Sequence, residues 1–223
     1  MFAFDYRIYV SESRFSFMGN KLLIATRNSG KIREFSRMLS ELSTDIVFEI
    51  VGLDDLGIDI EVEETGSTFE ENAVLKARQY AEASGEVALA DDSGLVVDAL
   101  SGAPGVLSAR YGGDGLDDQG RVNLLLENML DVPGWQRSAR FVAVIALAGP
   151  GVPDGLVTSE GAIEGAITHE PIGHDGFGYD PVFWIHRRAK TTAQMSAAEK
   201  DAISHRGRAL RRMSGTFKVL FSS

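Results

Sequence analysis

The feature that most constrains the fold is an unbroken apolar run near the middle of the chain. Residues 138–149 read SARFVAVIALAG, and every residue from Phe141 to Ala148 is apolar. A run of this length is typical of a strand that is buried on both faces of its sheet. Residues 156–167, LVTSEGAIEGAI, alternate well enough to predict its hairpin partner across the turn GPGVPDG. The chain therefore has a long antiparallel hairpin to accommodate.

Helices and further strands are interleaved with this hairpin. Hydrophobic spacing and capping signals predict where they begin and end. The expected strands lie at 21–25, 45–51 and within 87–100, and the expected helices at 32–42, 66–85, 117–130 and 196–213. This order predicts an α/β fold with an elongated mixed β-sheet flanked by helices. We expect a single two-lobed domain over residues 20–223.

Composition excludes several classes of protein. The sequence has no cysteine, which excludes disulfides and thiolate metal sites. No apolar run reaches the ~18 to 20 residues that span a bilayer, and residues 1–19 carry scattered charges, unlike a secretory signal. The net charge of −10 argues against a broad nucleic-acid surface, which is basic. We therefore expect a soluble, cytoplasmic protein that binds neither membrane nor nucleic acid.

The two kinds of charge are separated along the chain. Residues 45–98 hold fifteen acidic and two basic residues, whereas residues 187–218 hold nine basic and two acidic ones. An acidic segment can hold a divalent cation, and a basic one can hold phosphate. The alternative is that the two segments only form solvent-exposed surfaces of opposite charge, which would give the same composition.

Two adjacent carboxylates, Asp91 and Asp92, interrupt the strand expected within 87–100. A buried carboxylate costs several kcal/mol or more unless a partner compensates it. Neighbouring side chains on a strand point to opposite faces, so only one of the two can readily face a site at the end of that strand. Glu63 and Glu64 precede the helix that carries Lys76. Together these carboxylates suggest a Mg²⁺ site, and the alternative is a plain turn at Asp92.

The segment TRNSGK, residues 26–31, lies between the first strand and the first helix. A short glycine-containing loop there presents backbone N–H groups at a helix N-terminus, which favours anions. Lys31 in the first turn is unfavourable for the helix dipole unless an anion lies between it and the amides. The segment lacks the longer glycine-rich P-loop pattern. It therefore predicts a phosphate site, and the alternative is an ordinary capped turn.

Two later segments also carry chemistry. In GFGYDP, residues 176–181, glycines permit close backbone approach, and Phe177 or Tyr179 can stack on a planar base. In EKDAISHRGRAL, residues 199–210, a continuous helix would place charged and polar side chains next to one another. Gly207 costs about 1 kcal/mol relative to alanine inside a helix, which suggests that the backbone is unwound or closely approached there.

Together these segments resemble the inosine triphosphate pyrophosphatase family, whose members remove non-standard purine nucleoside triphosphates such as ITP, dITP and XTP. The matching stretches are TRNSGK, EETGSTFEENAVLKA, ADDSGLVVDALSGAPGVLSARYGG, GFGYDPVF and SAAEKDAISHRGRAL, and they occur in the family's order over roughly residues 21 to 212. Residues 1–19 do not resemble the family. We expect this extension to be disordered or non-native, with Met18 as a candidate start.

The resemblance implies an enzyme that hydrolyses a nucleoside triphosphate to the monophosphate and pyrophosphate with Mg²⁺, as a homodimer with the site in a cleft between two lobes. It implies that Asp92 is the general base and a metal ligand, that Glu64 is a second metal contact and that Ser93 touches the substrate. The implied phosphate-binding residues are Thr26, Arg27, Asn28, Ser29, Gly30, Lys31, Lys76 and Lys200. The implied base-pocket residues are Phe177, Gly178, Tyr179, Asp180, His205 and Arg206.

Selection of the base is expected to follow hydrogen-bond chemistry. Hypoxanthine and xanthine carry a 6-oxo acceptor that Arg206 or a backbone N–H can satisfy, whereas adenine presents a 6-amino donor, at a cost of roughly 1 to 3 kcal/mol for the unpaired group. Guanine shares the 6-oxo group, so its exclusion has to come from its 2-amino group.

Three rival functions remain open at this stage. A nucleotide sensor without turnover would use the same phosphate loop, but Asp92, Glu64 and Lys76 would then have no catalytic task. An enzyme of related fold that hydrolyses modified pyrimidine triphosphates is disfavoured by the segments SHR and GFGYDP. A phosphoryl-transferring kinase is disfavoured because the chain lacks a P-loop and kinase motifs.

Overall fold

The structure is a computed structural model, and it describes residues 20–42, 48–113 and 115–221. The expectation that residues 1–19 are disordered or non-native lies outside the described residues. Within them, no helix combines the length and apolar character needed to cross a bilayer.

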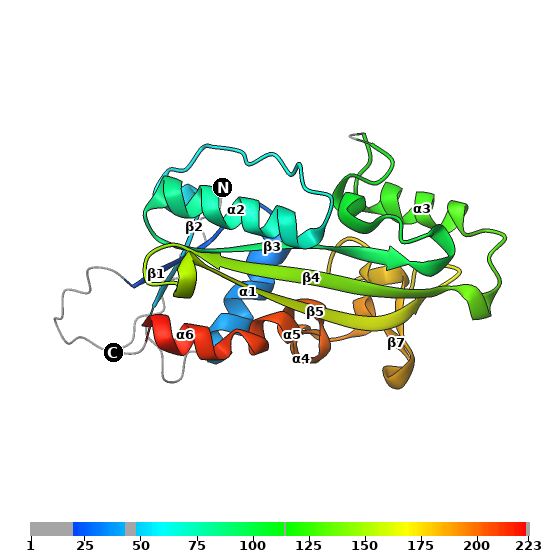
Figure 1. Cartoon of the computed structure of the whole chain (residues 1–223). Coiled ribbons are helices and arrows are strands. Elements are labelled where there is room, and N and C mark those ends of the chain that lie inside the picture. Colours follow the sequence, from blue (N-terminus) through cyan, green and yellow to red (C-terminus); the bar gives the residue numbers. More distant parts are fainter. Residues whose placement is uncertain (1–19, 43–47, 114, 222–223) are drawn as a thin grey trace, which may run out of the picture.

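The described strands form one elongated mixed sheet (Figure 1), as predicted. Their order across the sheet is β2-β1-β3-β4-β5-β6-β7. The three strands at one edge, β2, β1 and β3, pair in parallel, and all later pairs are antiparallel. The strands are β1 Lys21–Ile24, β2 Glu49–Gly52, β3 Val87–Val97, β4 Ser138–Ala148, β5 Leu156–Ile167, β6 Phe183–Ile185 and β7 Lys190–Thr191. The long hairpin predicted from the apolar run is β4 and β5.

Helices cover both faces of this sheet. In Figure 1, α2 lies on one face and α1, α5 and α6 lie on the other, while α3 lies toward the end of the sheet away from β1. The helices are α1 Ser29–Leu42, α2 Phe69–Ser84, α3 Asp118–Asn128, α4 Ala197–Ile203, α5 His205–Arg212 and α6 Ser214–Phe221. Helix α2 begins at a capping box formed by Thr68 and Glu71 and ends at Gly85 in the left-handed conformation.

Side-chain size sets how closely the helices approach the sheet. On the face toward α2, small residues such as Ala88, Ala90 and Ala146 meet the alanines of the helix. On the opposite face, larger residues such as Leu89 and Ile145 pack against α1, α5 and α6. A third cluster fills the end of the sheet that carries α3 and β6. Burial on both faces explains the nearly continuous apolar sequence of β4.

One glycine brings α5 directly onto the sheet. A Cβ atom on Gly161 of β5 would lie 2.1 Å from the carbonyl oxygen of His205 and 2.6 Å from the amide nitrogen of Ala209. No side chain fits at that distance, so glycine is required for the N-terminal half of α5 to rest on β5. This contact places His205 and its neighbour Arg206 over the middle strands.

Two expectations about local structure are wrong. The carboxylates Asp91 and Asp92 do not end a strand, because β3 continues through them to Val97 and pairs with β4 along its length. The C-terminal helix is not continuous either, since Ser204 is extended between α4 and α5 and its hydroxyl caps α5. The expected close approach at Gly207 is confirmed, because a Cβ there would lie 2.1 Å from the carbonyl oxygen of Asp201.

Candidate active site

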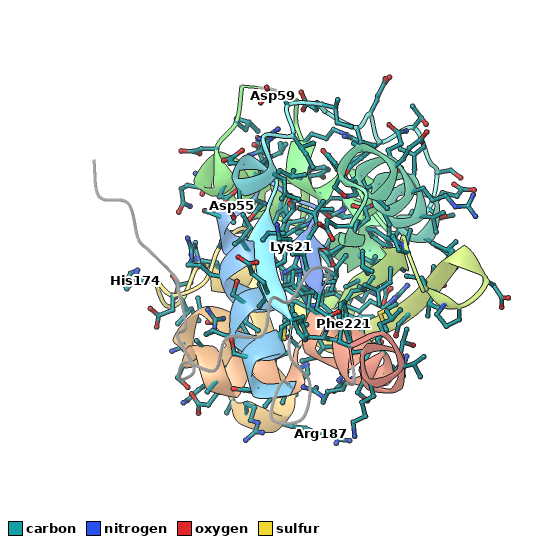
Figure 2. All side chains as sticks on the ribbon, turned by 90° about the vertical axis from the view of Figure 1, so that its left-hand side faces the viewer. Lys21, Asp55, Asp59, His174, Arg187 and Phe221 are labelled. Carbon is teal, nitrogen blue, oxygen red and sulfur yellow. The ribbon has the colours of Figure 1, made fainter. Side chains whose placement is uncertain are left out.

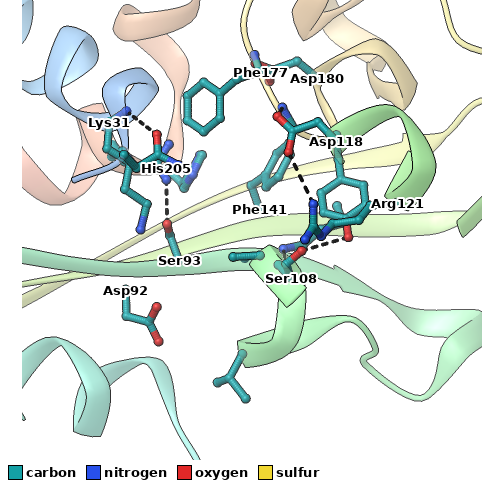
Figure 3. Close-up of a pocket in the computed structure, with 18 of the residues that line it drawn as sticks. Lys31, Asp92, Ser93, Ser108, Asp118, Arg121, Phe141, Phe177, Asp180 and His205 are labelled. Atoms are coloured by element: carbon teal, nitrogen blue, oxygen red, sulfur yellow. Dashed lines mark hydrogen bonds and ion pairs between the residues drawn. The ribbon is translucent and has the colours of Figure 1, made fainter. Parts of the chain in front are cut away.

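A pocket opens over the middle of β3 and collects most of the predicted site residues (Figure 3). Its walls come from the start of α1, from β3, from the segment between β5 and β6, and from α4 and α5. The predicted residues that line it are Asn28, Lys31, Glu64, Asp92, Ser93, Phe177, Gly178, Tyr179, Asp180, Lys200, His205 and Arg206. Segments far apart in the sequence therefore meet at one place.

Asp91 lies on the face of β3 toward α1 and α5, and cations surround it. Its carboxylate is 2.8 Å from the Nζ of Lys31 and 3.3 Å from the Nε of Arg206, and it accepts a hydrogen bond of 2.9 Å from the hydroxyl of Ser93. Burial raises the pKa of Asp91, but the charges of Lys31 and Arg206 outweigh burial and hold that pKa well below its usual value. Asp91 is therefore a permanently ionised anchor for two cations.

Asp92 points to the opposite face, toward α2, and is far less compensated. The amide of Asn72 donates to it at 3.1 Å, and the Nζ of Lys76 lies 3.5 Å away. Burial raises the pKa of Asp92; Lys76 opposes this and the nearby Glu64 carboxylate reinforces it, so the net shift is upward. A carboxylate of raised basicity at a pocket wall is a candidate proton acceptor.

Lys76 joins these acidic groups from α2. Its Nζ is 2.5 Å from a carboxylate oxygen of Glu64 and 2.8 Å from the carbonyl oxygen of Asp91. Arg110 adds a second cation at 3.3 Å from the other oxygen of Glu64. The lysine ammonium therefore lies near both Glu64 and Asp92. These are the two carboxylates expected to hold a metal ion.

A buried network of charged side chains lies on the other side of the pocket. Its central residue is Glu34, which the sequence analysis did not predict. Glu34 of α1 is 4% exposed and lies 2.8 Å from both the Nζ of Lys200 and an Nη of Arg206. Lys200 also pairs with Asp180. Burial raises the pKa of Glu34, but Arg206 and Lys200 outweigh this effect and bring it to about 2. Glu34 follows Lys31 by three residues, so helical spacing could have placed both on one face.

Aromatic rings form the part of the pocket beyond these charges. The Nζ of Lys200 lies 5.0 Å from the ring centroid of Phe177, and the guanidinium of Arg206 lies 5.4 Å from it. The imidazole of His205 stacks on Phe141 at 4.9 Å with 12° between the rings. Burial lowers the pKa of His205 well below its usual value and Arg206 lowers it further, so the ring is neutral at neutral pH.

Comparison with known proteins decides the family. The sequence model of the Ham1 family matches residues 22–216. The chain belongs to the Ham1 family. It is 49% identical over 191 residues to the dITP/XTP pyrophosphatase of Shigella flexneri, covering 86% of this chain and 94% of the relative. It is 46% identical over 194 residues to that of Bacillus licheniformis, covering 87% and 96%.

Solved structures of Ham1 proteins share the fold. The Ham1 protein of Coxiella burnetii aligns with a TM-score of 0.77 at 40% identity, over 87% of this chain and 96% of that one. The nucleoside-triphosphatase, or dITP/XTP pyrophosphatase, of Mycobacterium abscessus aligns with a TM-score of 0.68 at 45% identity, over 86% and 97%. The expected resemblance and fold class are both confirmed.

Not all residues assigned to phosphate in this Ham1 chain line the pocket. Those that do not are Thr26, Arg27, Ser29, Gly30 and Lys76. Arg27 turns away, because its guanidinium donates to the carboxylate of Asp54 and to the carbonyl of Ile58, both at 2.6 Å. Gly30 packs closely against the ring of Phe177, since a Cβ atom on Gly30 would lie 2.6 Å from that ring. A phosphate role for these residues stays a prediction.

Eight pocket residues were missed by the sequence analysis: Gly94, Leu95, Val106, Ser108, Ala109, Asp118, Arg121 and Phe141. The carboxylate of Asp118 accepts a hydrogen bond of 3.0 Å from the amide of Gly178, sixty residues later. The carbonyl of Ser108 accepts one of 3.0 Å from the hydroxyl of Tyr179. Both contacts join segments that are far apart in the chain, and no local pattern in the sequence predicts them.

Proposed function

We propose that this Ham1 protein hydrolyses non-standard purine nucleoside triphosphates, ITP, dITP and XTP, to the monophosphate and pyrophosphate. Relatives 44–49% identical to it over most of its length are named dITP/XTP pyrophosphatases. The observation that carries the proposal is the pocket over β3. There Asp92, whose pKa is raised, lies together with several cations and an aromatic wall. Removing such nucleotides prevents their incorporation into DNA and RNA.

The carboxylates near Lys76 suit Mg²⁺. Both Glu64 and Asp92 offer hard oxygen donors, and the charge of Asp92 is only partly neutralised by Lys76 at 3.5 Å. Among the described residues, no group of three or more acidic, histidine or cysteine side chains is arranged to hold a metal. Mg²⁺ usually takes one or two protein carboxylates and completes its shell with water and substrate phosphate, so a pair of carboxylates is enough to hold it. We propose that Glu64 and Asp92 hold the ion.

Different residues of this chain take different roles in pyrophosphate release. Water attacks the α-phosphorus, the bond to the bridging oxygen breaks, and pyrophosphate leaves. Asp92 accepts the proton of the attacking water, for which its raised pKa suits it. Lys31 and Lys76 lie on the two sides of β3 and stabilise negative charge that builds up on the phosphoryl oxygens. Bound Mg²⁺ would supply further positive charge to the same oxygens.

The base lies against the aromatic wall in this proposal. Phe177 stacks on the purine, and the two cations beyond its ring, Lys200 and Arg206, keep that ring in place. Both cations are already paired with Glu34, so their remaining N–H groups are held in fixed directions. A fixed donor satisfies the 6-oxo group of hypoxanthine or xanthine and leaves the 6-amino group of adenine unpaired.

Pyrophosphate release from ITP, XTP, GTP and ATP, with Mg²⁺ and with chelator, tests the proposal. We expect Mg²⁺-dependent release from ITP and XTP and little from ATP and GTP. Tight ITP binding without release would instead identify a nucleotide sensor. Release only from modified pyrimidine triphosphates would identify the rival hydrolase.

Two further properties complete the proposal. We expect a homodimer, because the resemblance to the family implies one, and sedimentation of the purified full chain would measure its mass in solution. A monomer at micromolar concentration would contradict this part. Cytoplasmic location stays a prediction from the sequence.

A further inference from the structure

A partly buried arginine with one unused, buried hydrogen-bond donor lines the aromatic part of the pocket. Arg121, on α3, has a side chain that is only 15% exposed. Its Nε is buried and has no hydrogen-bond partner in the part of the chain that the structure describes. Its ion pair with Asp118 is long, at 3.9 Å between Nη1 and Oδ1. A buried donor without a partner is costly, so this one points to an acceptor that arrives with the ligand.

The position of Arg121 identifies which part of the ligand it meets. In Figure 3, Phe141 and Phe177 lie between Lys31, at the phosphate side, and Arg121. Burial raises the pKa of Tyr179 and the charge of Arg121 opposes that rise, so the two side chains are neighbours. A purine nucleotide whose phosphates lie at Lys31 therefore presents its base to Arg121.

Helix α3 is connected to the base-pocket segment, which fixes Arg121 relative to the aromatic wall. Asp118, one turn before Arg121, accepts a hydrogen bond of 3.0 Å from the amide of Gly178 with its Oδ2. Its Oδ1 faces Arg121. Asp118 therefore links α3 to the segment that holds Gly178.

The candidate purines differ at carbon 2. Hypoxanthine carries hydrogen there, xanthine an oxo acceptor and guanine an amino donor. Because a guanidinium only donates hydrogen bonds, it pairs with an oxo group and repels an amino group. We propose that Arg121 reads the purine 2-position, favouring XTP over ITP and excluding GTP. This inference rests on the proposed function and names the preferred substrate within it.

The test compares three substrates on matched variants. The variants are Arg121→Met, which removes the charge and keeps the length, Arg121→Gln, which keeps donors without the charge, and Arg140→Met as control. Arg140 pairs with Asp98 at 2.9 Å outside the pocket. The readouts are kcat/KM for XTP, ITP and GTP, and calorimetric affinity for the monophosphates XMP, IMP and GMP, which needs no turnover. Thermal melting confirms that each variant is folded.

In Arg121→Met we expect the XTP-to-ITP ratio of kcat/KM to fall about tenfold or more, which is the loss typical of a hydrogen bond to a charged group. The GTP-to-ITP ratio should rise, XMP should lose affinity relative to IMP, and Arg121→Gln should lie between. Arg140→Met should leave every ratio unchanged.

Equal losses for all three substrates would overturn the inference and make Arg121 a structural residue. A parallel fall for GTP and XTP would also overturn it, because Arg121 would then not distinguish an oxo from an amino group. Failure of the proposed function is separate, since the native chain would then release no pyrophosphate from ITP or XTP. In that case the affinities for XMP and IMP still decide the role of Arg121.

Discussion

Asp91 and Asp92 are neighbours in the chain and opposites in environment. On one face of β3, Asp91 meets Lys31, Arg206 and the hydroxyl of Ser93, and its pKa lies well below the usual value. On the other face, Asp92 meets an amide and a cation at 3.5 Å, and its pKa is raised. Figure 2 views the molecule along this sheet, with helices packed on both of its sides.

The difference teaches how one strand serves two purposes. On the face toward α1 and α5, Lys31 and Arg206 neutralise the carboxylate of Asp91, and the same ion pairs hold these two cations in place. The face toward α2 leaves its carboxylate short of positive charge, so that a metal ion or a proton can bind there. The pairing of β3 with β4 through this point holds both side chains on a rigid backbone. Substituting each aspartate in turn separates the two roles.

Asp92→Asn should have the largest effect, and it should fall on activity. Removing a general base typically costs about 10²- to 10⁴-fold in rate. The asparagine keeps the shape and relieves a buried charge that is only partly compensated, so the melting temperature should not fall. Pyrophosphate release from ITP and thermal melting measure the two effects. Near-native turnover would remove Asp92 from the chemistry.

Asp91→Asn should act mainly on stability, by about 3–5 kcal/mol, because it leaves Lys31 and Arg206 without their buried partner. Chemical denaturation gives the free energy of unfolding. Activity should fall as well, since both cations line the pocket. If this variant were as stable as Asp92→Asn, the contrast between the two faces would be wrong.

Much of this arrangement was predictable from local sequence. The helix expected at 66–85, which is α2, and the hairpin of β4 and β5 both depend on neighbouring residues, and both were predicted correctly. The placement of Asp91 and Asp92 on opposite faces also follows from the two-residue period of a strand. Such features depend on a few consecutive side chains, which a sequence displays directly.

The errors arose where tertiary contacts decide. The sequence DDSG at residues 91–94 suggested the end of a strand. In the structure these residues pair with β4, so β3 continues past them. The break at Ser204 lets its hydroxyl cap a second helix, which rests on Gly161 of the neighbouring strand. Arg121 reaches the pocket only because α3 folds back, and nothing in its own segment indicated this.

Acid titration should test the comparison further. The ionised Glu34 should add about 3 kcal/mol to the free energy of unfolding, and this contribution should disappear in acid. Glu34 has a pKa near 2 in the folded protein and near 4.5 ordinarily, so its stabilising effect is present above about pH 4.5 and is lost as pH falls toward 2. Asp91 acts in the same direction. Asp92 acts in the opposite direction, because its raised pKa means that folding is favoured while it is protonated.

Denaturation of the native chain and of Glu34→Gln between pH 6 and pH 2.5 measures this effect. The substitution should cost stability at pH 6 and much less at pH 2.5, where Glu34 is protonated in the unfolded chain and must lose that proton on folding. Arg140→Met serves as the control and should keep the full acid dependence, because Arg140 pairs only with Asp98 outside the pocket. A pH-independent difference between native and Glu34→Gln would show that the charge of Glu34 does not stabilise the fold.

The smallest expected effect is stabilisation by Mg²⁺ alone, and it should depend on the face toward α2. An ion present at ten times its dissociation constant adds about 1.4 kcal/mol to the free energy of unfolding. Native protein and the folded Arg140→Met variant should both show this gain in MgCl₂ over matched ionic strength in KCl, and Asp92→Asn should not. The gain should also shrink in Glu64→Gln, because that carboxylate is the second proposed ligand. An equal gain in Asp92→Asn would place the ion elsewhere, and Asp92 would then remain a proton acceptor without a metal.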